Sequence, residues 1–424
     1  MKLWDKGITI DKKIEAFTIG NDREIDLHIA KYDVLASLAH AKMLQKINII
    51  TAEELQQLTE GLETLLTQIH NRTFVIESQF EDVHSKIEYE LTQTYGEVGK
   101  KIHTARSRND QVLVALQLFY KDHLNFIIEQ VQVLFETLLQ VADTHKEALL
   151  PGYTHLQVAM PSSFGLWFSA YAELLIDDVY LLQAALKTVD QNPLGSAAGY
   201  GSSFPIDRAF TTKELGFHTL KYNVVAAQMS RGKSERTVSM ALGSLSNTLA
   251  RFAMDICLYM SQNFDFISFP DALTTGSSIM PHKKNPDVFE LIRGKCNKIQ
   301  ALQTEIVLIT TNLPSGYHRD FQLLKEPMIS AFTDIKNVLE IFNHSIKQVH
   351  VKKIDFNDEK YKYLSTVDSI NNLVMDGVSF REAYQKIGSQ VQKGTYTAET
   401  SKKHSHIGSI HNLCLESIRA KFPR

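Results

Sequence analysis

The sequence is short of residues that interrupt helices. Glycine contributes 20 and proline 10 of the 424 residues, about 7% together and well below the roughly 12% of average proteins. A long chain with so few helix breakers is predicted to be mostly helical. Its length predicts two or three domains.

Three further shortages exclude whole classes of protein. No run approaches the roughly 18 apolar residues of a membrane span, and the start, MKLWDKGITIDKK, lacks the apolar core of a signal peptide. The net charge of −3 lacks the excess positive charge that is typical of proteins that bind nucleic acid. There are only three cysteines, Cys257, Cys296 and Cys414, so we expect a reducing compartment and predict a cytoplasmic protein.

Helical periodicity is what the sequence does contain. Five segments carry apolar residues at alternating spacings of four and three, the pattern of bundled helices that meet at shallow angles. They span 120–141, 168–186, 238–259, 288–309 and 328–349. An ordinary single-chain core would explain any one of them. Several carry further apolar residues off the main stripe, such as Phe126, Ile128, Val133 and Phe135, so we expect faces buried against partner subunits.

The predicted fold is therefore all-α, with a bundle of long helices at its centre. The domains are expected to be an N-terminal helical domain over 1–107, a central five-helix bundle over 108–351 and a small C-terminal helical domain over 352–424. The Gly- and Ser-rich segment at 193–208 is not a phosphate loop, because no strand precedes it and the lysine of that motif is missing.

The segment TTGSSIMPHKKNPD (274–287) crowds polar groups between two apolar segments. Pro286 suits the first turn of a helix, so the segment could be nothing more than a helix opening. The alternative is an anion site, because Ser277, Lys283 and Asn285 lie close to a helix N-terminus. A carboxylate substrate would fit such a site.

Two other segments place donors next to predicted helices. In HTARSRNDQ (103–111), Asn109 or Asp110 could simply cap the following helix, but Ser107 and Asn109 also present donors suited to a carboxylate. PSGYHRDFQLLKEP (314–327) offers three different polar side chains that lead into the fifth long helix: Tyr317, Gln322 and Lys325.

Histidines give one candidate for proton transfer and one for metal binding. Thr154 and His155 lie in a predicted turn between two helices; a lone histidine is more often structural, but its ordinary pKa suits proton transfer near neutrality. His404, His406 and His411 cluster near the C-terminus. A zinc site usually needs a fourth ligand at suitable spacing, and the sequence offers none, so no metal and no cofactor are predicted.

These motifs carry a resemblance to a known family. GSSIMPHKKNP closely resembles the signature loop of the fumarase/aspartase superfamily. HTARSRNDQ, GYTHLQ and the KKNPD ending resemble the argininosuccinate lyase family in particular, since fumarases and aspartases lack RSRNDQ. The resemblance covers nearly the whole chain and includes EDVHSKIE (81–88) and GVSFREAY (377–384).

The resemblance implies a reaction, the reversible β-elimination of argininosuccinate to arginine and fumarate in arginine biosynthesis, and a set of roles. His155 and Ser277 match the catalytic histidine and serine; we favour Ser277 as the base and His155 as the group serving the leaving guanidinium. Substrate-binding positions match at Ser107, Asn109, Thr154, Lys283, Asn285, Tyr317, Gln322 and Lys325. The family also implies a homotetramer with a 20-helix core, whose active sites are shared between subunits.

Two departures from the family pattern affect the far end of the substrate pocket. Asp22 lies near the position of a serine that usually reaches the amino acid end of the substrate. Arg231 is kept, but its usual acidic neighbours are Ser230 and Gly232, followed by Lys233. An alternative substrate is therefore an N-acylated argininosuccinate, such as the N-succinyl compound, or a related succinyl compound. A binding or structural protein that retains the fold without activity is the other alternative.

Overall fold

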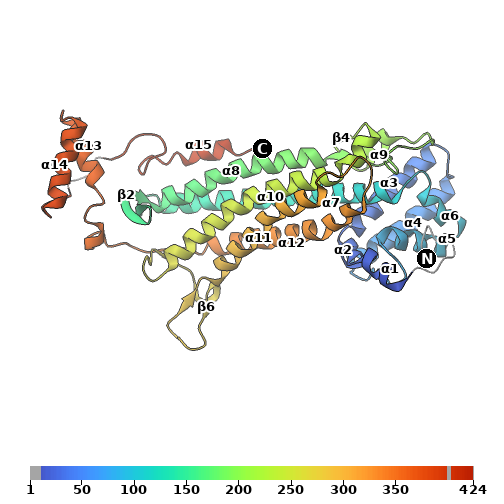
Figure 1. The fold of residues 1–424 in the computed structure, drawn as a ribbon, viewed down its shortest axis with the longest axis horizontal. Coiled ribbons are helices and arrows are strands. Elements are labelled where there is room, and N and C mark those ends of the chain that lie inside the picture. The colour runs from blue at the N-terminus through green and yellow to red at the C-terminus, as the bar shows by residue number, and fades with distance from the viewer. Residues whose placement is uncertain (1–10, 399–402, 424) are drawn as a thin grey trace. The chain divides into compact units, whose positions relative to one another are not determined.

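The computed structural model describes residues 11–398 and 403–423. Five long helices dominate these ranges, as predicted: α7 (Arg108–Thr144), α8 (Phe164–Val189), α10 (Val224–Met260), α11 (Asp287–Thr310) and α12 (Lys325–Ile346). Every predicted apolar segment lies within one of them, except that the last segment runs past the end of α12 to Val349. The all-α prediction is confirmed, since the strands of the described residues are short and occur only as four two-stranded pairs (Figure 1).

The chain folds into two compact units, and each unit takes three stretches of sequence. Unit 1 contains the residues up to Ile128, Leu181–Ser244 and Lys298–Ile335. Unit 2 contains Glu129–Tyr180, Leu245–Asn297 and the residues from Lys336 onward. Each long helix contributes one part to each unit. The predicted domain boundaries after residues 107 and 351 divide the chain differently and stay a prediction.

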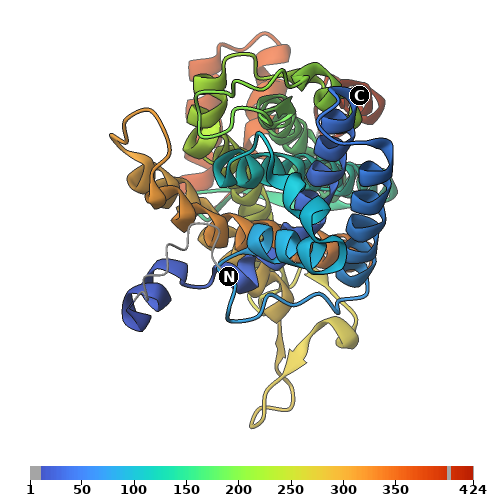
Figure 2. The same ribbon diagram turned by 90° about the vertical axis from the view of Figure 1, so that its right-hand side faces the viewer.

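Unit 1 begins with a series of shorter helices, shown in blue in Figures 1 and 2. A capping box between Thr51 and Glu54 starts α4, whose leucines at 58, 62 and 65 are buried, and α4 packs against α3. The complete elements of unit 1 are α1 (Lys12–Ile19), α2 (Asp22–Ile25), η1 (Asp26–His28), α3 (Ala30–Lys46), α4 (Ala52–His70), α5 (Val83–Tyr95), α6 (Glu97–Lys100), η2 (Lys101–His103), α9 (Arg208–Glu214), η4 (Arg319–Leu324), and the parallel pair β3 (Gln191–Asn192) and β4 (Thr219–Leu220).

A break in α10 is the main irregularity of unit 1. Arg231 has an extended ψ of 131°, and Gly232 follows with φ of +83°. The Glu235 carboxylate accepts the Gly232 backbone N–H at 2.7 Å, which satisfies a donor that the break removes from the helical ladder. A β-carbon at Gly232 would lie 2.9 Å from Thr310 and 3.0 Å from Phe321, so both conformation and space require glycine there.

Unit 2 is held by aromatic side chains from three long helices. Phe252 of α10 stacks on Tyr171 of α8 with ring centroids 4.2 Å apart and on Phe342 of α12 at 5.1 Å. The complete elements of unit 2 are the hairpins β1 (Leu149–Thr154) with β2 (Gln157–Ser163) and β6 (Thr275–Gly276) with β7 (Lys284–Asn285), the antiparallel pair β5 (Ile267–Ser268) and β8 (His350–Val351), and the helices η3 (Asp271–Leu273), η5 (Glu359–Tyr361), α13 (Thr366–Met375), α14 (Phe380–Gln392) and α15 (Leu415–Lys421).

The apolar residues of α7 that lie outside its main apolar stripe differ in burial. Phe135 is fully buried and packs on Phe422 with ring centroids 4.6 Å apart. Phe126 and Val133 stay partly exposed, at 40% and 42%. The other long helices also leave large apolar side chains exposed, among them Leu174, Leu181, Met240, Met254, Leu291, Leu308 and Ile341. None of the helices in the described ranges combines the length and apolarity that a bilayer crossing needs.

Candidate active site

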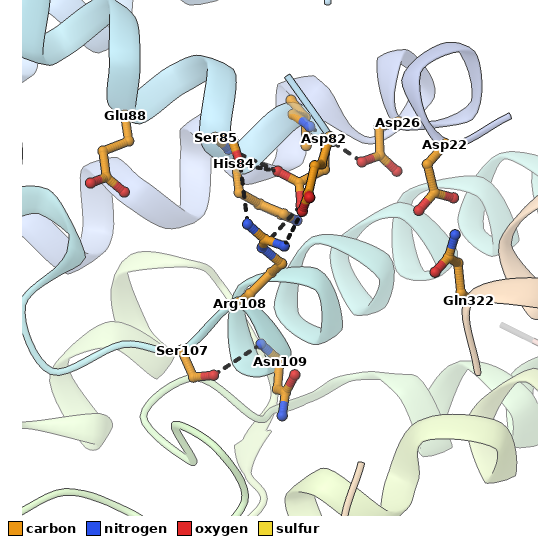
Figure 3. Close-up of polar contacts among 12 residues, drawn as sticks. Asp22, Asp26, Asp82, His84, Ser85, Glu88, Ser107, Arg108, Asn109 and Gln322 are labelled. Carbon is orange, nitrogen blue, oxygen red and sulfur yellow. Dashed lines mark hydrogen bonds and ion pairs between the residues drawn. The ribbon is translucent and has the colours of Figure 1, made fainter. Parts of the chain in front are cut away.

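The start of α7 is fixed by a reciprocal cap. Asn109 donates its backbone N–H to Ser107 Oγ at 3.3 Å, and Ser107 donates its own backbone N–H to Asp110 Oδ1 at 2.8 Å. Asp110 therefore takes part in capping, as one reading of the sequence predicted, but Ser107 supplies the hydroxyl. These bonds leave the Asn109 side chain pointing away from the cap (Figure 3).

Asp110 also holds the Gly- and Ser-rich segment against this helix start. Its Oδ2 accepts the backbone N–H groups of Gly195 at 3.0 Å and Ala197 at 2.9 Å. The residue is fully buried, and burial raises the pKa of its carboxyl, although the three N–H donors and Arg106 oppose that shift.

A pocket of about 470 Å³ lies within unit 1 beside the start of α7. Half of the ten predicted site residues line it: Ser107, Asn109, Tyr317, Gln322 and Lys325. Asp22 and Arg231, which the sequence associated with the far end of the substrate pocket, also line it. So do four charged side chains without a predicted role: Asp26, Glu81, Asp82 and Arg108. The pocket therefore brings together two of the predicted groups, Ser107 with Asn109 and the three side chains Tyr317, Gln322 and Lys325.

Lys325 is held by two carboxylates. Its Nζ lies 2.6 Å from Asp26 Oδ1 and 2.9 Å from Asp22 Oδ1, and only 3% of Lys325 is exposed. Burial disfavours the ammonium, but the charges of Asp26 and Asp22 and their hydrogen bonds outweigh it and raise the pKa of Lys325. Burial likewise raises the pKa of Asp22 to about 6, despite the neighbouring Lys325.

Gln322 is fixed by bonds from both ends of its amide. Its Nε2 donates to the carbonyl oxygens of Thr18 at 2.9 Å and Ile19 at 3.2 Å. Its Oε1 accepts from Arg319 Nε at 3.1 Å, and Arg319 also donates to the Thr18 carbonyl. The short helix η4 thus ties this wall of the pocket to the end of α1.

Arg108 anchors the opposite wall (Figure 3). It contacts Glu81 at 2.9 Å, Asp82 at 3.0 Å and Ser85 Oγ at 3.2 Å. Burial of Asp82 works against its charge, but His84, Arg108 and the bonds from Ser85 prevail and lower its pKa. The EDVHSKIE motif, which supported the resemblance without an assigned role, supplies all these partners.

The predicted histidine lies at the tip of a hairpin in unit 2. The turn that the sequence predicted is present, but it joins strands β1 and β2, which the sequence did not predict. Thr154 pairs with Gln157 across the turn, and the two turn residues, His155 and Leu156, have φ of +53° and +59°. Residues other than glycine seldom adopt this conformation. Thr154 and His155 are both exposed.

The signature loop forms the hairpin β6–β7, also in unit 2. Ser277 is half-buried, and its Oγ accepts the backbone N–H groups of Met280 at 3.1 Å and Ile279 at 3.4 Å. Lys284 pairs with Asp271, whereas Lys283 is exposed and makes no ion pair with any part of the chain that the structure describes. The helix α11 begins at Asp287, directly after Pro286, so the predicted helix opening is confirmed.

The five predicted residues of unit 2, namely Thr154, His155, Ser277, Lys283 and Asn285, do not line the pocket of unit 1. Lys233, which favoured the alternative substrate, is exposed and does not line it either. In the C-terminal segment, His404 lies 3.1 Å from Asp368 and near His411. No group of three or more potential ligands among residues 11–398 and 403–423 is arranged to hold a metal ion.

The family model described as lyase matches residues 6–301. The chain is 52% identical over 419 residues to the argininosuccinate lyase of Parabacteroides distasonis, covering 99% of this chain and 94% of that protein. It is 41% identical over 386 residues to the argininosuccinate lyase of Thermotoga neapolitana, covering 91% and 97% of the two chains.

Solved structures support the same fold at greater distance. A class II fumarase from Schistosoma mansoni superimposes with a TM-score of 0.75 at 16% identity, covering 90% of this chain and 88% of that one. EDDS lyase in complex with formate superimposes with a TM-score of 0.72 at 21% identity, covering 98% and 89%. Together with the identity to named lyases over nearly the full length, these findings show that the chain belongs to the argininosuccinate lyase family.

Proposed function

We propose that this protein catalyses the reversible β-elimination of argininosuccinate to L-arginine and fumarate, as a step of arginine biosynthesis. The observation that carries the proposal is identity of 51–52% with argininosuccinate lyases over 99% of the chain. Cys257, Cys296 and Cys414 form no disulfide among the described residues, which suits the reducing cytoplasm that we expect for this enzyme.

In this proposal the pocket of unit 1 binds the substrate. The backbone N–H groups at the start of α7, with Ser107 and Asn109, face a carboxylate of the succinyl part, because a helix N-terminus favours negative charge. Tyr317, Gln322 and Lys325 form the end that takes the arginine part. The fixed positions of Gln322 and Lys325 reduce the ordering that substrate binding would otherwise require.

The chemistry requires removal of a weakly acidic proton from carbon next to a carboxylate. The resulting carbanion spreads its charge into that carboxylate, so the enzyme must stabilise charge that exists only on the way to the transition state. We assign this stabilisation to Lys283 and Asn285, with Thr154 contacting the substrate. Lys283 is suited to it because its ammonium has no competing ion pair among the described residues.

We assign proton removal to Ser277 and assistance of the leaving guanidinium to His155. A serine is a poor base unless its alkoxide is stabilised. The two backbone N–H groups that donate to Ser277 Oγ favour the charged form of the oxygen and therefore lower the cost of ionising it. Loop closure over the bound substrate would bring Ser277 to the reacting carbon and exclude water.

We propose further that the protein is a homotetramer whose active sites are shared between subunits. The binding residues and the residues assigned to chemistry belong to different units of the chain. Large apolar side chains such as Leu291 at 65% and Leu308 at 71% exposure remain uncovered on the long helices. Burying such faces against partner subunits would remove a large apolar surface from water.

The decisive experiment is to follow fumarate by its ultraviolet absorbance after adding argininosuccinate to the purified protein, with size measured by light scattering. We expect fumarate and arginine in equal amounts. A parallel panel of succinyl compounds distinguishes a related lyase, which would release fumarate only from another substrate. A protein that releases no fumarate from any of them would be a non-catalytic member of the fold, and the proposal would fail.

A further inference from the structure

The EDVHSKIE motif (81–88) places a buried histidine next to two residues of the pocket wall. His84 lies in the first turn of α5, is only 2% exposed and does not line the pocket. Its Nδ1 lies 2.9 Å from Oδ1 of Asp33, a residue of α3 that is 1% exposed. Histidine and carboxylate thus form a pair that solvent does not reach.

The surroundings of this pair favour the charged form of the imidazole. The described residues give Asp33 no other ion-pair partner, and a buried carboxylate without a counterion is costly. Burial disfavours the His84 imidazolium, but the charges of Asp33, Asp82 and Asp26 outweigh it and raise the pKa of His84. His84 is therefore a buried cation behind the wall of the pocket.

Asp82 connects this cation to the pocket (Figure 3). Its Oδ1 accepts the backbone N–H and the hydroxyl of Ser85, both at 2.8 Å, and its Oδ2 lies 3.0 Å from Arg108 Nε. Burial opposes the charge of Asp82, and His84 and Arg108 are the two charges that most favour it and so lower its pKa. Arg108 is the first residue of α7 and lines the pocket.

Arg106 connects the partner of His84 to the same helix start. Its guanidinium is buried and donates to a serine hydroxyl and to a backbone carbonyl oxygen. Burial lowers the pKa of Arg106, and the charge of Asp33 is the first to oppose that shift. If His84 lost its charge, the buried Asp33 carboxylate would draw on Arg106 instead. Arg106 immediately precedes Ser107, so its movement would disturb the cap of α7.

We propose that His84 is a positioning residue, whose imidazolium fixes the start of α7 at the pocket. On one side it satisfies Asp33, so that Arg106 stays in place. On the other side it supports the contact of Asp82 with Arg108. This inference rests on the proposed function, in which the start of α7 faces a carboxylate of the succinyl part. His84 acts only through these neighbours, because it lies outside the pocket lining.

The charge of His84 gives a signature that packing alone would not give. Because the pKa of His84 is raised, the imidazolium is present below that pKa and is lost as pH rises through it. The wild-type KM should therefore increase as pH rises above the ordinary histidine value of about 6.5. The titratable groups that face His84 are Asp33, Asp26, Asp82 and His103. Burial and two arginines lower the pKa of His103 to about 4, so His103 does not titrate in this range.

The experiment measures kcat and KM for argininosuccinate, together with the melting temperature, in wild type, His84→Gln and the control Leu91→Ala. Glutamine keeps a polar side chain without the charge. Leu91 is a buried apolar residue of the same helix, so its truncation removes packing alone. We expect His84→Gln to raise KM roughly 10-fold, as for one weakened charge-assisted contact, with kcat within about twofold of wild type. Leu91→Ala should lower the melting temperature and leave KM unchanged.

Two results together support the inference: the higher KM of His84→Gln, and a wild-type KM that rises with pH toward the value of a variant whose own KM stays flat. A merely structural role would lower the melting temperature and the active fraction, and hence the apparent kcat, without raising KM. An unchanged KM in folded His84→Gln, or an equal rise in Leu91→Ala, would overturn the inference.

Asp33→Asn provides a second variant in case His84→Gln does not fold. Removing this carboxylate lowers the pKa of His84, so the rise of KM should move to lower pH than in wild type. A wild-type KM that does not change with pH, or a rise that stays at the same pH in Asp33→Asn, would contradict the proposed role.

Failure of the proposed function is a separate outcome. If wild type releases no fumarate from argininosuccinate, the proposed function fails, and crystal structures of wild type and His84→Gln then test the role of His84. Displacement of Arg106 or Arg108 in the variant supports the inference. Both guanidinium groups in their wild-type positions would contradict it.

Discussion

The pocket of unit 1 and the hairpins of unit 2 differ in how far their polar and charged side chains are buried and paired. In the pocket, charged groups are paired and at least half-buried: the buried Lys325 has two carboxylates, and the half-buried Arg108 has two more. In unit 2, His155 and Lys283 are exposed at hairpin positions, and Ser277 is half-buried. In the function that we propose, recognition is therefore built into a fixed framework, whereas the groups assigned to chemistry occupy loops.

This difference follows from the cost of burying charge. A desolvated ion needs fixed partners, so a preorganised binding site belongs on packed helices. A group that must approach the substrate after the substrate has bound needs a segment that can move without losing many packing contacts. An exposed hairpin is such a segment. Substitutions in the two regions should consequently have different effects, on stability in unit 1 and on turnover in unit 2.

Ser277→Ala should show the largest effect. Removing the proposed base is expected to lower kcat by on the order of 10³-fold or more, while KM and the melting temperature change little, because the two N–H groups that Ser277 Oγ accepts belong to exposed residues and can bond to water instead. Steady-state kinetics and thermal unfolding measure both quantities. Ser278→Ala is the matched control, since Ser278 is the exposed neighbouring serine. Near-normal turnover in Ser277→Ala would end its assignment as the base.

Hybrid tetramers test whether the two regions meet across subunits. Gln322→Ala impairs the pocket of unit 1, and Ser277→Ala impairs the loop of unit 2. If each active site combines regions from different chains, exchange of subunits between the two inactive proteins restores some intact sites and therefore some fumarate production. Each variant exchanged with itself is the control. Mass-verified hybrids without activity would show that each chain carries its whole site.

Two glycine substitutions test whether the two regions differ in their contribution to the free energy of unfolding. Gly232→Ala places a β-carbon at positive φ against Thr310 and Phe321, so we expect a loss of about 2 kcal/mol, measured as a lower denaturation midpoint. A β-carbon added at Gly276 of the signature loop would meet no atom within 4 Å, and the φ of this residue is not positive. Gly276→Ala should therefore leave the midpoint nearly unchanged. If both variants lowered the denaturation midpoint equally, the surroundings of Gly232 would not be more tightly packed than those of Gly276, contrary to this comparison.

The smallest expected effect is at the tip of the histidine hairpin. Leu156 has φ of +59° and is 69% exposed, and glycine is the favoured residue at the second position of such a turn. Leu156→Gly should therefore raise the free energy of unfolding by about 0.5 kcal/mol. Leu156→Val, which is disfavoured at positive φ, should lower it. If Leu156→Val had a higher denaturation midpoint than Leu156→Gly, the idea that this turn is strained would be refuted.

The helices could be predicted from sequence because their periodicity is local. The five apolar segments needed no information from elsewhere in the chain, and four of them lie within a long helix, while the fifth runs three residues past the end of α12. The hairpin over 149–163 gave no such signal: Pro151 and Pro161 face each other in it, and a register shift interrupts the pairing after Pro151. The break in α10 was not predicted either, because the apolar segment begins at 238, after Gly232, whereas α10 begins at Val224.

The binding site could be predicted only where a motif marked it. Ser107, Asn109, Tyr317, Gln322 and Lys325 were found through motif resemblance and do line one pocket. Of the two carboxylates that hold Lys325, Asp22 was associated with the far end of the pocket but not with Lys325. Asp26 was not found, because it lies 299 residues away from Lys325 in the chain. The N–H donors to Ser277 could not be predicted either. Every residue except proline has a backbone N–H, and only the conformation of the loop directs two of these groups at the Ser277 hydroxyl.

The contact made by Asp110 has a consequence for synthesis of the chain. This carboxylate caps the start of α7 and also accepts two N–H groups from residues 85 and 87 positions later. At roughly 5–20 residues per second on the ribosome, those partners emerge on the order of ten seconds after Asp110. Until then, one oxygen of a side chain destined for full burial lacks its partners. We therefore expect the nascent chain to keep the start of α7 hydrated until the segment around Ala197 has been made.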